Sequence, residues 1–234
     1  MITILKNQQV QFQNDTNIKF TNIVEYYTLW VHQIKTPIAS IRLQLQNENT
    51  EFSKRILEDL LRIEQYVEMV LMFLRLDSDT SDYVIAAQDL DPIICQAVKK
   101  FSTQFIRKKI RLYYTPLSKT VIPDEKWLLF VLEQILSNAL KYTKSGSISI
   151  TLEQPNVLCI KDTGIGIAPE DLPRIFEKGY TGYNGRNDKK ASGIGLYLCK
   201  RICDNLGHSI TATSSLDNGT SIFIDFTQKK LTVE

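Results

Sequence analysis

The sequence has few cysteines, no long apolar run and almost no net charge. The close pair Cys199 and Cys203 has an i, i+4 spacing that is neither a CxxC motif nor a complete zinc pattern, so we expect reduced thiols in a core. A total of 28 Lys and Arg against 26 Asp and Glu excludes a global field that recruits nucleic acid or a membrane surface. No segment reaches the roughly 18 apolar residues of a membrane helix, and no signal peptide opens the chain. We therefore expect a soluble, cytoplasmic piece of something larger.

Apolar residues at helical spacing dominate the first third of the chain. The first stripe comprises Ile23, Tyr27, Trp30, Ile34, Ile38, Ile41 and Leu45, and the second comprises Phe52, Ile56, Leu60, Ile63, Val67, Val70 and Leu74. An extra step of four in the first stripe straddles Pro37 and predicts a bend there. The polar segment 47–50 between the stripes predicts an antiparallel helical hairpin. Because two helices cannot bury both apolar faces alone, we expect a homodimer that forms a four-helix bundle.

The rest of the chain mixes helical and strand patterns after a polar, acidic hinge at 77–82. The patterns predict strands at 83–87, 110–114, 147–152 and 157–161, helices from 91, at 124–142 and at 195–205, and a closing hairpin that turns at 217–219. This order predicts an α+β layered domain. The expected division is an upstream linker (1–15), the helical hairpin (16–79), the mixed domain (80–230) and a tail (231–234).

Two groups of residues have the composition of functional sites. His32 lies on the side of the first helix opposite to the apolar stripe, so it is expected to face water, where an imidazole nitrogen can accept a phosphoryl group. Gly164 and Gly166 directly follow a predicted strand. Gly193 and Gly195 precede a predicted helix, whose free amide groups at the N-terminus suit phosphate oxygens.

Five segments of the chain resemble the sequence boxes of one family, in the same order. They are the H box at 32–37 (His-Gln-Ile-Lys-Thr-Pro), the N box at 134–142, the G1 box at 162–166, the F box at 176–180 and the G2 box at 193–196. Residues 15–228 thus resemble a bacterial two-component sensor histidine kinase. The segment Trp-Val-His-Gln-Ile-Lys-Thr-Pro at 30–37 further resembles the corresponding segment of the intramembrane-sensing group, which responds to cell-wall-active peptide antibiotics.

The resemblance implies a hairpin that dimerises and carries the phosphorylated histidine, followed by a Bergerat-type (GHKL) α/β sandwich that binds ATP with Mg²⁺. It also implies an upstream membrane sensor region absent from this chain. The full-length protein would then lie in the cell membrane, with this part facing the cytoplasm.

The resemblance also implies roles for residues of the nucleotide site. Asn138 would coordinate Mg²⁺ with its amide oxygen, and Asp162 would accept a hydrogen bond from the adenine amino group. Tyr142 would stack on the base or ribose, while Lys141 neutralises phosphate. The other implied nucleotide-binding residues are Gly164, Gly166, Arg186, Gly193, Gly195, Leu196 and Thr220. A lid at about 177–192 would bring Arg186, Lys189 and Lys190 to the γ-phosphate, with a solvated loop face as the alternative for these cations. A structural turn is the alternative for Thr220.

The implied reaction transfers the γ-phosphoryl group of MgATP to Nε2 of His32 and then to an aspartate of a response regulator. Lys35 would offset phosphate charge. Thr36 matches the residue that orients a water for dephosphorylation of the regulator, and local structure ahead of the proline is its alternative role.

Two residues depart from the family pattern. Gln33 stands where Glu or Asp is usual, and an amide accepts a hydrogen bond from Nδ1 but cannot take its proton. Glu133 and water are the alternative bases. Gln134 replaces the commoner Asn, which puts a second contact with metal or phosphate in doubt. A GHKL-type ATPase and a catalytically weakened dimer scaffold remain the alternative functions. The hairpin with His32 argues against the first, and the two glutamines are the support for the second.

Overall fold

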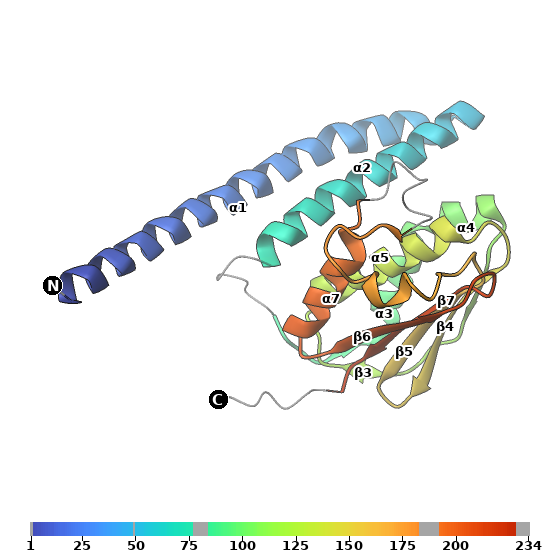
Figure 1. Cartoon of the computed structure of the whole chain (residues 1–234). Helices are drawn as coiled ribbons and strands as arrows, with labels where there is room; N and C mark the ends of the chain where they lie inside the picture. The colour runs from blue at the N-terminus through green and yellow to red at the C-terminus, as the bar shows by residue number, and fades with distance from the viewer. Residues whose placement is uncertain (1, 49, 77–83, 183–191, 228–234) are drawn as a thin grey trace. The chain divides into compact units, whose positions relative to one another are not determined.

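The computed structural model describes residues 2–48, 50–76, 84–182 and 192–227. The chain divides into two compact units, Met1–Asp82 and Tyr83–Glu234. The first unit is helical and the second combines helices with a sheet, in the order that the sequence predicts (Figure 1). Among the described residues, no helix is long and apolar enough to cross a membrane.

The first unit is a hairpin of two long helices, α1 (Ile2–Gln46) and α2 (Glu51–Leu76). Helix α1 begins at Ile2, so residues expected to form an upstream linker continue the same helix. Pro37 lies within α1, and the helix extends nine residues beyond it to Gln46.

Only part of the predicted stripe of α1 is buried in the single chain. Val31 and Ile38 are 2% and 5% exposed, whereas Tyr27 and Trp30 are both 37% exposed. The predicted stripe comprises the larger apolar side chains of α1 and does not include the smaller Val31. The apolar surface of α1 is therefore wider than the face that is buried within this chain.

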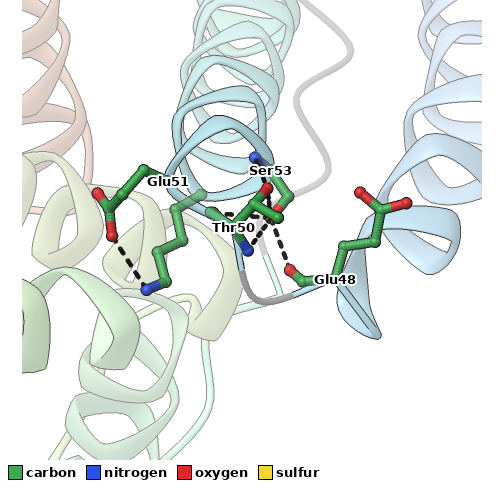
Figure 2. A network of polar contacts seen from close by, with 5 residues as sticks. Glu48, Thr50, Glu51 and Ser53 are labelled. Atoms are coloured by element: carbon green, nitrogen blue, oxygen red, sulfur yellow. Dashed lines mark hydrogen bonds and ion pairs between the residues drawn. The ribbon is translucent and has the colours of Figure 1, made fainter.

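The turn between the helices is closed by the buried side chain of Ser53 (Figure 2). Its hydroxyl donates to the carbonyl oxygen of Glu48 at 2.6 Å and accepts from the N–H of Thr50 at 3.1 Å. The hydroxyl of Thr50 accepts in return from the N–H of Ser53 at 3.0 Å, which is the geometry of an N-terminal helix cap. These bonds satisfy polar main-chain groups in the turn.

The second unit contains a five-stranded sheet with the order β2-β4-β5-β7-β6. The strands are β2 (Arg111–Tyr114), β4 (Ser147–Gln154), β5 (Val157–Asp162), β6 (Ser209–Ser214) and β7 (Thr220–Asp225). Strand β2 is parallel to β4, and the other neighbours are antiparallel. A separate pair joins β1 (Gln88–Asp89) to β3 (Thr120–Val121).

Helices of the second unit lie on one side of this sheet (Figure 1). They are α3 (Leu90–Lys100), α5 (Glu125–Tyr142) and α7 (Gly195–Asn205), with the shorter α4 (Ser102–Lys108) and the 3₁₀ turn η1 (Leu172–Arg174) between them in sequence. Leu132 and Leu136 of α5 and Ile148 and Ile150 of β4 are at most 1% exposed. This core fixes α5 and its functional residues against the sheet.

The prediction of a strand at 83–87 is wrong. In the described part of this segment, Ile85 forms an isolated bridge with Asp124, and the first strand is β1 at Gln88–Asp89. The N–H of Val84 donates to the Asp124 carboxylate at 2.7 Å, and Val84 and Ile85 are 71% and 55% exposed. The apolar residues that suggested a strand therefore have no sheet face to cover.

Candidate functional site

The C-terminal end of β5 carries a buried carboxylate, Asp162, which is 8% exposed. Its Oδ1 accepts from the N–H of Gly164 at 2.8 Å and from the N–H of Thr220 at 3.3 Å. Burial raises the pKa of Asp162, while these two bonds and the hydroxyl of Thr143 act to lower it. The carboxyl group is thus held in one orientation, with remaining capacity to accept a hydrogen bond from a ligand amino group.

Close backbone approaches surround Asp162. Gly219 has a φ of +77°, and a Cβ there would lie 1.9 Å from the carbonyl oxygen of Asp162. A Cβ on Gly164 would lie 2.6 Å from the carbonyl oxygen of Tyr142. Glycine is therefore required at both positions by space, and at Gly219 also by conformation. These contacts gather the end of α5, the end of β5 and the start of β7 at one place.

Sequence reasoning missed two members of this site, Thr143 and Gly219. Thr143 is fully buried and forms the C-cap of α5. Its place directly after Tyr142 in the N box was the available signal. Gly219 was assigned to a turn alone, although it directly precedes Thr220.

The last turns of α5 add the residues predicted to bind ribose, phosphate and metal. Asn138 and Tyr142 are both half-buried, and their i, i+4 spacing places them on one face of the helix. The Lys141 ammonium lies 5.0 Å from the centroid of the Tyr142 ring. The carbonyl oxygen of Tyr142 accepts from the N–H of Ile165 at 3.3 Å, which links α5 to the glycine turn after β5.

The second glycine pair forms the start of α7. Gly195 is the first residue of this helix and Leu196 the second. Gly193, with a φ of +67°, accepts at its carbonyl oxygen from the N–H of Gly179 at 2.9 Å. A Cβ on Gly195 would lie 2.3 Å from Nε2 of Gln134, so the Gln134 amide lies against the first turn of α7. The free N–H groups of this turn can bind phosphate oxygens.

Other predicted site residues lie elsewhere or outside the described part of the chain. Arg186, Lys189 and Lys190, and with them most of the expected lid, fall in 183–191, which the structure does not describe. Glu133, one of the alternative bases, forms an ion pair with Lys100. In the described ranges, no cluster of three or more His, Cys, Asp or Glu side chains could hold a metal ion.

The predicted catalytic residues of the hairpin lie on α1. His32 and Gln33 are exposed. The Thr36 hydroxyl donates to the carbonyl oxygen of His32 at 3.2 Å, as is common for threonine in a helix. Lys35 Nζ lies 3.3 Å from Oε1 of Glu68 on α2.

One protein-family model matches a part of the second unit. Residues 123–230 match the family described as histidine kinase-, DNA gyrase B-, and HSP90-like ATPase. The chain is 34% identical over 230 residues to the sensor histidine kinase YxdK of Bacillus subtilis, covering 94% of this chain and 70% of that protein. The chain belongs to the sensor histidine kinases. Its predicted enzyme class, a protein-histidine kinase of two-component signalling, is therefore confirmed.

Further relatives of this kinase include the sensor protein kinase GraS of Staphylococcus aureus, 33% identical over 98% of this chain and 66% of GraS. The sensor protein BceS of Halalkalibacterium halodurans is 32% identical over 84% of this chain and 60% of BceS. The kinase described here thus spans between three fifths and about two thirds of these two relatives.

Solved structures of histidine kinases share the fold. ShkA, solved in complex with AMPPNP, has a TM-score of 0.58 at 23% identity, covering 86% of this chain and 45% of ShkA. AdeS of Acinetobacter baumannii has a TM-score of 0.56 at 22% identity, covering 85% of this chain and 98% of the AdeS chain. The predicted fold class is thereby confirmed.

Proposed function

We propose that His32 is the residue that this kinase phosphorylates, with ATP bound by the second unit as the phosphoryl donor. The observation that carries this proposal is the exposure of the histidines. The sequence contains two, of which His32 is exposed on α1 and His208 is only 2% exposed. An acceptor nitrogen must reach the γ-phosphate, and only His32 offers one without unfolding.

The nucleotide site is proposed to extend from Asp162 to the start of α7. The Asp162 carboxylate accepts a hydrogen bond from the amino group of adenine, and a base with a carbonyl at that position cannot donate this bond. Tyr142 stacks on the base or ribose, with Lys141 beside the phosphates. Gly193, Gly195 and Leu196 present main-chain N–H groups to the phosphate oxygens.

The transfer is an in-line displacement that relies on positioning. The N–P bond forms from the Nε2 lone pair of His32 as the bond from Pγ to the bridging oxygen breaks, and ADP leaves with that electron pair. The Gln33 amide oxygen accepts a hydrogen bond from Nδ1–H and orients the ring during the transfer, and the Nδ1 proton is then released from the imidazolium to water. Lys35 offsets the negative charge on the transferred group.

The residues present fit a magnesium ion bound together with the phosphates. Asn138, which is half-buried on α5, would hold the ion through its amide oxygen, because Mg²⁺ requires few protein ligands besides phosphate and water. The ion supplies neutralisation of phosphate charge. The half-buried Asn138 orients the amide oxygen that holds it.

The hairpin is proposed to dimerise and to dock a response regulator. Exposed apolar residues support the dimer, because they would otherwise remain in water. They are Ile23, Tyr27, Trp30 and Ile41 on α1, and Phe52, Ile63, Tyr66 and Val70 on α2. Similarity to YxdK, GraS and BceS supports an upstream membrane region and the antibiotic-responsive group. The proposed partners are a second copy of the chain and a response regulator, and not a nucleic acid.

Phosphatase activity on the regulator is proposed to depend on Thr36. Its hydroxyl must leave the His32 carbonyl to orient a water, which a rotation about one side-chain bond achieves. Thr36→Ala should slow loss of label from the phosphorylated regulator and leave labelling of His32 unchanged. Loss of both activities would refute this role.

The experiment that tests the main proposal is incubation of the full chain with γ-labelled MgATP. We expect acid-labile, base-stable label on the protein, absent from His32→Ala and retained in His208→Leu. Labelling of His32→Ala, or free phosphate without protein label, would refute the proposal. The second outcome would indicate an ATPase, and failure to bind nucleotide would indicate a scaffold.

A further inference from the structure

An ion pair joins the two helices beside the proposed phosphorylation site. Lys35 Nζ lies 3.3 Å from Glu68 Oε1, and the two side chains are 45% and 29% exposed. Lys35 follows His32 by three residues, so the two side chains are neighbours on the helix surface. Glu68 on α2 is therefore paired with a side chain that neighbours His32 on α1.

A second pair of the same kind lies further along the hairpin. Arg42 forms an ion pair with Glu64, with side chains 38% and 16% exposed. Arg42 follows His32 by ten residues, a separation of about 15 Å along α1. Glu64 is therefore paired further from His32 along α1 than Glu68 is, and its charge should act more weakly on the imidazole in salt. The chain thus contains its own control for a charge effect at His32.

Phosphorylation changes the balance of charge around Lys35. A phosphoryl group carries up to about two negative charges near neutral pH. Lys35 carries one positive charge, which cannot fully neutralise both the phosphoryl group and Glu68. The Glu68 carboxylate also repels the phosphoryl group directly.

We propose that Glu68 competes with the phosphoryl group on His32 for Lys35, and thereby makes phosphohistidine less stable and more readily transferred to the regulator. This inference rests on the proposed role of His32. Glu68 takes no part in the chemistry: the N–P bond breaks and a P–O bond to the acceptor aspartate forms, with the electron pair returning to the imidazole. It acts by its charge, through competition for Lys35 and through repulsion of the phosphoryl group.

The test compares Glu68→Gln with Glu64→Gln in the full chain at about 0.1 M ionic strength, where the Debye length is roughly 10 Å. The readout is the equilibrium ratio of phosphorylated to free protein at fixed ADP and ATP concentrations. Removal of one carboxylate charge that shares Lys35 with a dianion predicts a rise of roughly threefold to tenfold in Glu68→Gln. Glu64→Gln should stay close to the wild-type ratio. The difference should shrink in about 1 M salt, where the Debye length is roughly 3 Å.

Glu68→Asp separates charge from packing. It keeps the carboxylate, so the equilibrium ratio should return toward that of the wild-type protein. Equal ratios in wild type and Glu68→Gln would overturn the inference, as would an equal rise in Glu64→Gln or a Glu68→Asp variant that behaves as the Gln variant does. If the wild-type protein takes no label, or His32→Ala takes it, the proposed function itself fails.

Discussion

Replacement of Asp162 by Asn should separate nucleotide binding from stability. The Asn Oδ1 can accept from the N–H groups of Gly164 and Thr220 as the carboxylate does, and the variant should fold. Its Nδ2 is a donor, however, and would face the amino group of adenine. The loss of one hydrogen bond to a charged acceptor, about 1.5–3 kcal/mol, corresponds to ATP binding that is weaker by roughly 10-fold to 150-fold.

The stability of the same variant should change in the opposite sense. Because burial raises the pKa of Asp162 above the ordinary value of 3.8, the carboxyl group favours folding below that pH, and this stabilisation is lost as the pH rises through the folded-state pKa. Asn carries no such dependence. The melting temperature of Asp162→Asn should therefore equal or exceed that of the wild type at pH 7, with the difference shrinking toward pH 4.

Asp124 provides the matched control. It is 3% exposed, and its carboxylate accepts from the N–H groups of Val84, Lys126 and Trp127 at the start of α5. This end of the helix is about 21 Å from Asn138. Asp124→Asn places a donor against at least one of these N–H groups, so it should cost about 1–3 kcal/mol of stability and leave ATP affinity unchanged.

Calorimetric titration with MgATP and thermal melts across pH 4–7.5 measure both effects. Affinity within threefold of wild type in Asp162→Asn would refute the adenine contact. A melting temperature at pH 7 well below that of the wild type would refute the assignment of burial as the dominant influence on this carboxyl group.

Three further predictions test the packing within each of the two units. Ser53→Ala leaves the N–H and C=O groups that its hydroxyl bonds without these partners, and should lower the free energy of unfolding of the hairpin by about 1–3 kcal/mol in urea titrations; an unchanged midpoint would contradict this. Gly207→Ala and Gly219→Ala both place Ala at positive φ, but open space surrounds Gly207, whereas a Cβ on Gly219 would lie 1.9 Å from a carbonyl oxygen. The first should cost about 1–2 kcal/mol in thermal melts and keep ATP binding, and the second should lose ATP binding in calorimetry; equal effects would refute the steric argument. Burial lowers the pKa of His208, whose ring nitrogens have no hydrogen-bond partner among the described residues, so stability should fall as the pH drops below about 6.5, where the unfolded chain takes up the proton first. Melts from pH 7.5 to 5 should show this loss in the wild type and a smaller one in His208→Leu.

Local patterns were sufficient for much of the fold. Helix α2 and strands β4 and β5 follow from apolar residues a few positions apart, so a local pattern finds these elements. The predicted stripe of α2 is only partly buried in the single chain, because Leu60 and Val67 are 5% and 7% exposed, whereas Phe52, Ile63 and Val70 are 71%, 44% and 43% exposed. The 83–87 segment has a similar local pattern, but Val84 bonds the side chain of Asp124, 40 residues later. A contact of that separation leaves no trace in the spacing of apolar residues.

The same distinction applies to the site. The positions of Asn138 and Asp162 follow from motifs, because a helix face and a strand end determine where each side chain lies. The ion pair of Glu133 does not follow from its motif, because its partner Lys100 lies on a different helix. The side chains of this ion pair are 21% and 14% exposed. A contact between two helices leaves no mark in a local motif, so the ion pair of Glu133 could not be predicted from the N box.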